Sequence, residues 1–197
     1  MRSIALLLVL GVVAGLDQGP VSGRKTLIAV AVIGNAPRAT VEALAPILRE
    51  TFGAEIVAAP DLALPASSWN ASRRQFLSTK LLDALASAKR PEWERLLGIA
   101  DVDLYVPDLN FVFGEADSRH GVAVFSLARL RASADEALLS RRAATEAVHE
   151  LGHTYGLSHC DKPTCVMWFS NTLSESDRKG TRFCPAHARE LAENRAR

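Results

Sequence analysis

The sequence predicts a mixed α/β (α+β) fold, in which helices pack on a mixed sheet within one compact domain. Short apolar, β-branched runs alternate with amphipathic helical periods along the chain, which is typical of a sheet covered by helices. The chain has 197 residues, of which 48% are hydrophobic and 23% charged. That length is enough for one well-buried core and short for two independent ones. The sequence contains no internal repeat and no low-complexity segment.

The first half of the domain is predicted to alternate strands and helices. KTLIAVAVIG (25–34) is short and apolar and indicates the first buried strand. TVEALAPILRETFG (40–53) has helical spacing and ends at Gly53, with Pro46 as a potential kink. AEIVAAPD (54–61) is expected to be a second strand, and SRRQFLSTKLLDALASAK (72–89) an amphipathic helix. The run from Leu96 to Ala100 is expected to close this layer.

The second half is predicted to hold three further strands and then helices. DVDLYVPD (101–108), LNFVFGEA (109–116) and GVAVFSLARL (121–130) are strand-like runs separated by turn residues. The segment LNFVFG could line a cleft and pair with an extended peptide, or it could be interior. A long helix is expected from about Glu136 to Tyr155, because its apolar residues recur every three or four positions. The closing run HARELAENRAR indicates a terminal helix with Leu191 packed inward.

The N-terminal residues resemble a secretory signal peptide. Arg2 precedes an apolar run from Ile4 to Val13, and small residues follow at Ala14 and Gly15. The run is too short to cross the hydrocarbon core of a bilayer, which is about 30 Å thick. We therefore expect residues 1–24 to be a signal peptide and linker, and residues 25–197 to be an exported domain, periplasmic or extracellular, with no stable membrane span after processing. A cytoplasmic protein with a buried strand or an uncleaved anchor at this end is the alternative.

The charge balance names no partner, because the chain has no strong overall electrostatic field. The 23 basic and 22 acidic residues give a formal net charge of +1, so neither nucleic acid nor an anionic membrane is favoured. We expect a monomer with a peptide or protein substrate. His120 in the polar loop, and Arg141 and Arg142 near the start of the long helix, are expected to be solvated.

The stretch HELGHTYGLSHC (149–160) predicts a metal site on the long helix. His149 and His153 are four residues apart, so they lie about one turn apart on the same face and can reach one ion. Gly156 is placed to end the helix with a positive φ, which lets the chain turn back. His159 can then supply a third nitrogen and leave the fourth position of a tetrahedral zinc open.

This ligand set predicts hydrolysis. Zinc held by three neutral nitrogens lowers the pKa of a bound water to about 7 and polarises a carbonyl oxygen. Glu150 lies between the histidines in angle and can act as the general base that takes the proton from water and returns it to the leaving amine. A solvated helix end is the alternative, but the full pattern HExxHxxGxxH is rarely met by chance.

The residues beyond this motif resemble the archaemetzincin family of zinc metallopeptidases. The resemblance is carried by His149, Glu150, His153, Gly156, His159 and Cys160, followed by Cys165, Met167 and Cys184. DVDLYVPDLNFVFGEA and SLARL are also similar to that family. The resemblance implies a compact zincin-like domain with a catalytic zinc on His149, His153 and His159, and it implies that Met167 is the methionine of the Met-turn, with no chemistry of its own.

The same resemblance implies a second, structural zinc. Cys160, Cys165 and Cys184 match three of the family's four thiolates, and His187 stands in CPAH where the family has a cysteine. The segment from Met167 to Cys184 is also one residue shorter than usual. Zinc accepts Cys₃His as well as Cys₄, so we expect two zinc ions per chain. A disulfide between Cys160 and Cys165, or packed and reactive thiols, are the alternatives.

Together these patterns predict an exported zinc metallopeptidase that acts on peptide bonds. The sequence does not separate an aminopeptidase from an endopeptidase. Two functions of other classes compete with it: a zinc-stabilised module that binds peptides or proteins with little turnover, and a redox sensor built on the three cysteines. Glu150 favours hydrolysis, because a module that only binds has no chemical need for a carboxylate there.

Overall fold

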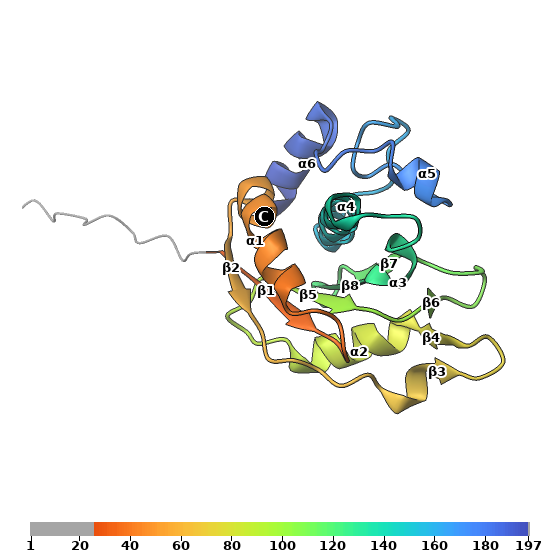
Figure 1. Cartoon of the computed structure of the whole chain (residues 1–197). Helices are drawn as coiled ribbons and strands as arrows, with labels where there is room; N and C mark the ends of the chain where they lie inside the picture. The colour runs from red at the N-terminus through yellow and green to blue at the C-terminus, as the bar shows by residue number, and fades with distance from the viewer. Residues whose placement is uncertain (1–25, 197) are drawn as a thin grey trace, which may run out of the picture.

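The computed structural model describes residues 26–196, and its main feature is a five-stranded sheet in the order β2-β1-β5-β8-β7 (Figure 1). Its strands are β1 (Leu27–Val32), β2 (Glu55–Ala58), β5 (Arg95–Ala100), β7 (Gly114–Asp117) and β8 (Val122–Ser126). The first four in the sheet are parallel, and β7 runs antiparallel to β8 at one edge. The central strands are almost wholly buried and apolar, as strands covered on both faces must be.

Helices cover both faces of this sheet. One face carries α1 (Ala39–Phe52) and α4 (Glu136–Thr154), and the other carries α2 (Ser78–Ala88) (Figure 1). The short helix α3 (Leu127–Leu130) follows β8 directly. The chain ends with α5 (Leu173–Ser176) and α6 (Pro185–Arg195), which lie above α4 and α1 in Figure 1. Two apolar cores result, and the one on the α1 and α4 side also contains Cys165, Met167 and Leu191.

The predicted architecture is confirmed, but the helix expected over residues 72–89 begins only at Ser78. Its first part forms β4 (Gln75–Leu77), which joins β3 (Trp69–Asn70) and β6 (Leu104–Tyr105) in a second small sheet after a 3-10 turn at Ala66–Ser68. Phe76 pairs with Leu104 and packs on Trp69, with ring centroids 4.8 Å apart. These pairings with distant residues outweigh the local helical period.

The strand expected over residues 109–116 is also shorter, because only Gly114–Asp117 joins the sheet. Residues 109–113 form a loop that makes one isolated backbone bridge, between Val112 and Leu104, and two of its carbonyls are bound by side chains. Arg73 donates to the carbonyls of Leu109 and Asn110, and Gln75 also donates to that of Asn110. The backbone therefore has partners without a sheet ladder.

Arg142 is buried, so the prediction of a solvated side chain there was wrong. It is 5% exposed and makes two hydrogen bonds of 2.7 Å to the carboxylate of Asp177. It also donates to the carbonyls of Leu130 and Ala132. These acceptors satisfy the guanidinium, which is what allows its burial.

The predicted signal peptide and linker at residues 1–24 lie outside the described residues. Within residues 26–196, none of the helices combines the length and apolar character that a membrane crossing requires.

Candidate active site

Helix α4 holds the residues of the predicted site at one edge of the sheet. It begins after Asp135, whose carboxylate accepts a hydrogen bond of 2.8 Å from the backbone of Leu138. It packs against β7 and β8, which buries His149 and Glu150 at 6% and 5% exposure. The helix ends at Thr154, and Gly156 follows with a φ of 84°. The turn predicted at Gly156 is therefore confirmed, and it brings His159 back towards the helix.

The three histidines meet as predicted. One ring nitrogen from each of His149, His153 and His159 lies within 4.8 Å of the others. The Nδ1 atoms of His149 and His153 lie 2.7 Å from the carbonyl oxygens of Val166 and Leu157, respectively. A carbonyl only accepts, so each Nδ1 carries the hydrogen and each Nε2 keeps its lone pair.

The spacing of these nitrogens fits a zinc ion. The Nε2 atoms of His149 and His153 are 3.1 Å apart, close to the roughly 3.3 Å expected for two nitrogens about 2.0–2.1 Å from a tetrahedral ion. Burial, together with nearby Lys179, lowers the pKa of His149 well below its usual range, and burial lowers the pKa of His153 to about 4. Burial also lowers the pKa of His159. All three rings are therefore neutral at neutral pH, as metal ligands must be.

Glu150 lies between β7 and the histidines. Burial, followed by the charge of Glu146, raises the pKa of its carboxyl well above the usual range. Gly114 of β7 lies directly against it: a Cβ at position 114 would come within 2.6 Å of both Cγ and Oε1 of Glu150. The absence of a side chain at Gly114 thus makes room for the carboxylate.

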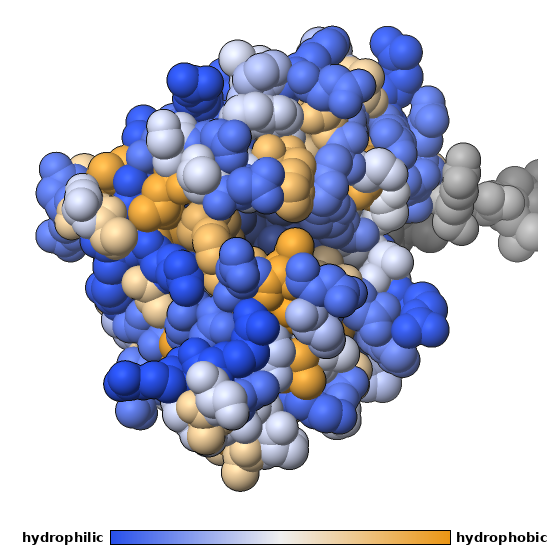
Figure 2. All heavy atoms as spheres, turned by 90° about the vertical axis from the view of Figure 1, so that its right-hand side faces the viewer, coloured by the Kyte–Doolittle hydropathy of each residue, from blue (hydrophilic) through white to orange (hydrophobic). Residues whose placement is uncertain are grey.

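A cleft of about 380 Å³ contains Glu150 and the three histidines. Residues 109–113, which we call the apolar lip, line one side of it together with Gly114–Ala116, and Phe169, Ser170 and Asn171 line it from the segment before α5. Figure 2, which looks onto the side of the molecule where β6 and α5 lie in Figure 1, shows hydrophobic residues around a hollow. The cleft has a volume typical of ligand sites, about 300–1,000 Å³.

The cleft also holds a buried ion pair that the sequence reasoning missed. Lys179 Nζ lies 3.3 Å from Glu146 Oε1, and both side chains are at most 3% exposed. Ser176 donates to the same Glu146 oxygen at 2.9 Å. Glu146 could have been noticed, because it lies three residues before His149 on the same helix. Lys179 gave no local signal, since it is 30 residues further along the chain than His149.

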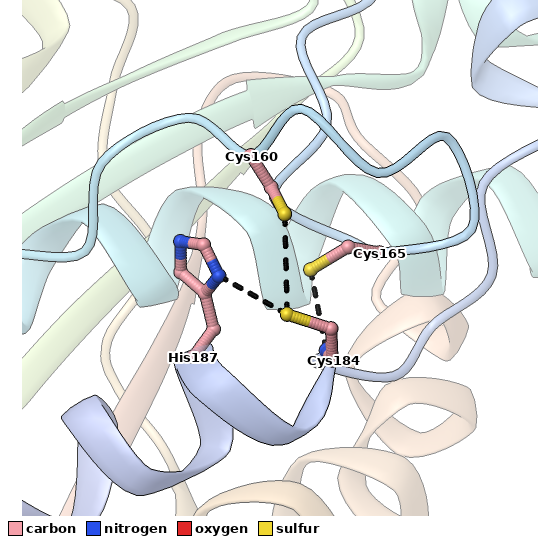
Figure 3. Close-up of side chains that lie close together, drawn as sticks. All are labelled: Cys160, Cys165, Cys184 and His187. Atoms are coloured by element: carbon pink, nitrogen blue, oxygen red, sulfur yellow. Dashed lines mark hydrogen bonds between the residues drawn. The ribbon is translucent and has the colours of Figure 1, made fainter.

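Cys160, Cys165, Cys184 and His187 form a second cluster, as predicted (Figure 3). Their ligand atoms also lie within 4.8 Å of one another. The Sγ atoms of Cys160 and Cys184 are 3.9 Å apart, against roughly 3.8 Å for two sulfurs about 2.3 Å from a tetrahedral zinc. All three cysteines are free, so the alternative disulfide does not form in the described structure.

His187 fits this second cluster through Nδ1. It projects from α6 towards Cys184, with Nδ1 3.3 Å from Sγ (Figure 3). Its Nε2 lies 3.1 Å from the carbonyl oxygen of Ser158, next to His159. Hydrogen bonds from His187 lower the pKa of the Cys184 thiol to about 6, whereas burial raises that of Cys165 to about 11. His120 belongs to neither cluster: it is exposed and hydrogen-bonded to Asp117 at 2.6 Å.

Known proteins are similar to this chain in sequence and in fold. The model of peptidase family M54 matches residues 53–193. The archaemetzincin of Archaeoglobus fulgidus is 43% identical over 145 residues, which make up 74% of this chain and 86% of that protein. The chain belongs to the archaemetzincin family, peptidase family M54. It is accordingly a zinc metallopeptidase, a hydrolase.

Solved structures agree with this membership. The archaemetzincin of Methanopyrus kandleri has a TM-score of 0.81 and 36% identity, and the match covers 89% of this chain and 98% of that one. A zinc-dependent peptidase from Methanocorpusculum labreanum has a TM-score of 0.72 and 27% identity, with 83% and 99% covered. The zincin-like fold expected from the resemblance is thereby confirmed, and this archaemetzincin has two candidate metal sites.

Proposed function

We propose that this archaemetzincin hydrolyses peptide bonds at the three histidines, with Glu150 as general base. His149, His153 and His159 would hold a catalytic zinc, and Cys160, Cys165, Cys184 and His187 would hold a structural one. The observation that carries the proposal is the pair of Nε2 atoms 3.1 Å apart, each on a ring whose Nδ1 faces a backbone carbonyl. Such second partners fix the tautomer and orientation of metal-binding histidines.

When bound, the zinc supplies Lewis acidity for the attack of water on a peptide carbonyl. The protein positions the other groups. Burial raises the pKa of Glu150 when no metal ion is near, but the positive charge of a zinc at the histidines would favour its ionised form. Glu150 can then take the proton of the attacking water on its carboxylate and deliver it to the leaving amine. Its burial at 5% exposure keeps competing solvent away from that carboxylate, which strengthens the electrostatic interactions there.

Strand β7 supports peptide binding beside these groups. It is the edge strand of the sheet, and Gly114–Ala116 line the cleft. One side of β7 pairs with β8, so its other side can pair with an extended peptide by strand addition. A peptide bound in this way would lie next to Glu150.

The test compares the parent with Glu150→Gln, which keeps the size of the side chain but removes its basicity. We expect the parent to cleave a mixture of peptides, and the variant to lose about 10²- to 10⁴-fold in rate while keeping its zinc. Cleavage is read by mass spectrometry and zinc by elemental analysis. A zinc-loaded parent that cleaves no peptide would favour the binding module, and an equally active variant would remove Glu150 from the reaction.

A further inference from the structure

We propose that this archaemetzincin selects peptides with a large apolar side chain beside the cleaved bond, held between Phe169 and the apolar lip. The inference rests on the proposed function and names the substrate class of that site. Its starting point is where exposed hydrophobic residues lie. Among the described residues, the large ones that are strongly exposed are Trp69, Leu109 and Phe169, at 47%, 43% and 45%.

Two of these three residues border the cleft. Leu109 belongs to the apolar lip, and Phe169 comes from the segment that follows Met167. Phe111, Val112 and Phe113 extend the apolar lip towards Gly114. Exposed hydrophobic patches that border a site mark the surfaces that a ligand covers. Figure 2 shows hydrophobic residues on either side of the hollow.

Phe169 places this surface next to the reacting bond. Its ring centroid lies 4.8 Å from that of His159. His159 in turn lies 4.8 Å from His153 and 5.5 Å from His149, between ring centroids. A side chain that packs on Phe169 therefore belongs to a residue adjacent to the cleaved bond.

The apolar lip is held in place before any substrate binds. Arg73 fixes the carbonyls of Leu109 and Asn110 at 2.7 and 3.0 Å. The guanidinium of Arg129 stacks over Phe111 at 4.0 Å and is itself held by two hydrogen bonds to Asp103, of 2.6 and 2.7 Å. Phe111 also contacts Phe113 edge to face, at 5.1 Å. A rigid surface loses little entropy on binding, so it contributes to selectivity.

The charges in the cleft favour a neutral side chain over an acidic one. Lys179 is the cationic side chain among the described cleft residues apart from the histidines, and Glu146 already pairs with it. Glu115 and Glu150 add two further carboxyl groups. An acidic substrate side chain would meet these carboxyl groups without a free lysine or arginine from the described cleft. The apolar surface thus determines which class of substrate side chain is preferred.

The first arm of the test digests a peptide library with the parent and reads the residues on both sides of each cleaved bond by mass spectrometry. We expect Leu, Phe, Met and Tyr to be enriched on one side of the bond. Matched peptides with Leu or Ala at that position then give kcat/KM. The parent should prefer Leu by roughly 10- to 100-fold, the range that a hydrophobic pocket supplies.

The second arm uses Phe169→Ala and Leu109→Ala, with Trp69→Ala as the matched control for an exposed apolar residue outside the cleft lining. We expect the Leu-to-Ala preference to fall several-fold in the first two variants and to stay at the parent's value in the control, with the zinc content equal in all. An equal preference in all four proteins would overturn the inference, and so would a parent preference for Lys or Asp.

A binding arm separates this inference from the proposed function. Fluorescently labelled Leu and Ala peptides are titrated with zinc-loaded Glu150→Gln, and anisotropy gives the affinity. Tighter binding of the Leu peptide supports the inference even if the parent cleaves nothing, in which case the proposed function alone fails. Equal affinity for the Leu and Ala peptides together with unselective cleavage would support the proposed hydrolysis and overturn the inferred selection of apolar side chains.

Discussion

Gly114 and Glu150 show that the geometry of the site depends on the absence of a single Cβ atom. The two residues belong to different elements, and the carboxylate occupies the space that a side chain on β7 would fill. The sequence predicted Glu150, because its angle on the helix follows from local spacing. No such local signal marked Gly114, since its importance arises from a contact across the fold.

We expect Gly114→Ala to lower kcat by about 10²-fold, because a displacement of about 1 Å is enough for such a loss. The new Cβ would come within 2.6 Å of Glu150 Oε1 and also of the Val124 carbonyl oxygen, which cannot move aside. The zinc content should not change. The control is Gly180→Ala, whose Cβ would lie 3.9 Å from its nearest neighbour, the carbonyl oxygen of Thr164. Parent-like turnover in Gly114→Ala would mean that the position of Glu150 is not limiting.

The segment from Leu157 to His187 is the element on which the site most depends. It supplies His159, the carbonyl of Val166 that orients His149, the cleft residue Phe169, and Lys179. Its regular structure is limited to α5 and the start of α6. The cysteine cluster and the ion pair between Arg142 and Asp177 are therefore important for its conformation.

We expect Cys165→Ser to lose the second zinc, to melt lower by about 10 °C or more and to weaken catalysis while the catalytic zinc stays bound. Each kcal/mol lost shifts the Tm of a domain this size by about 2–4 °C, and structural zinc contributes several times that. Cys165 is 1% exposed and precedes Val166, whose carbonyl faces His149. Thr164→Ser is the control at an exposed neighbour. An unchanged melting temperature and rate in Cys165→Ser would show that the second site is dispensable.

The ion pair between Arg142 and Asp177 makes the stability of this segment depend on pH. Hydrogen bonds from Arg142 lower the pKa of Asp177 below its usual value of 3.8. A lowered pKa in the folded state stabilises the protein above pH 3.8, and this contribution is lost as the pH falls through the folded value.

Asp177→Asn should therefore lower the free energy of unfolding by about 1–3 kcal/mol at pH 7, and the difference from the parent should shrink below about pH 3.8. Urea denaturation at pH 7 and pH 3 measures both. Asp83→Asn, which removes an exposed pair with Lys80, should have almost no effect at either pH. A difference for Asp177→Asn that is equal at both pH values would rule out this linkage.

At the scale of the whole molecule, local patterns predicted the sheet, the long helix and the triad of histidines. The resemblance predicted the second cluster, including His187. What could not be predicted depends on contacts between distant residues: the small sheet that makes α2 begin only at Ser78, the burial of Arg142 by Asp177, and the pairing of Lys179 with Glu146. The signal peptide, export and a monomeric state stay predictions.

The most direct measurement is the metal content per chain of the purified parent, His153→Ala and His187→Ala, by elemental analysis. Two zinc ions in the parent and one in each variant are expected, because the two clusters share no ligand. One zinc in the parent that is lost in His153→Ala but kept in His187→Ala would show that the histidine in CPAH has cost the structural site. A parent that binds no zinc would contradict the proposed mechanism.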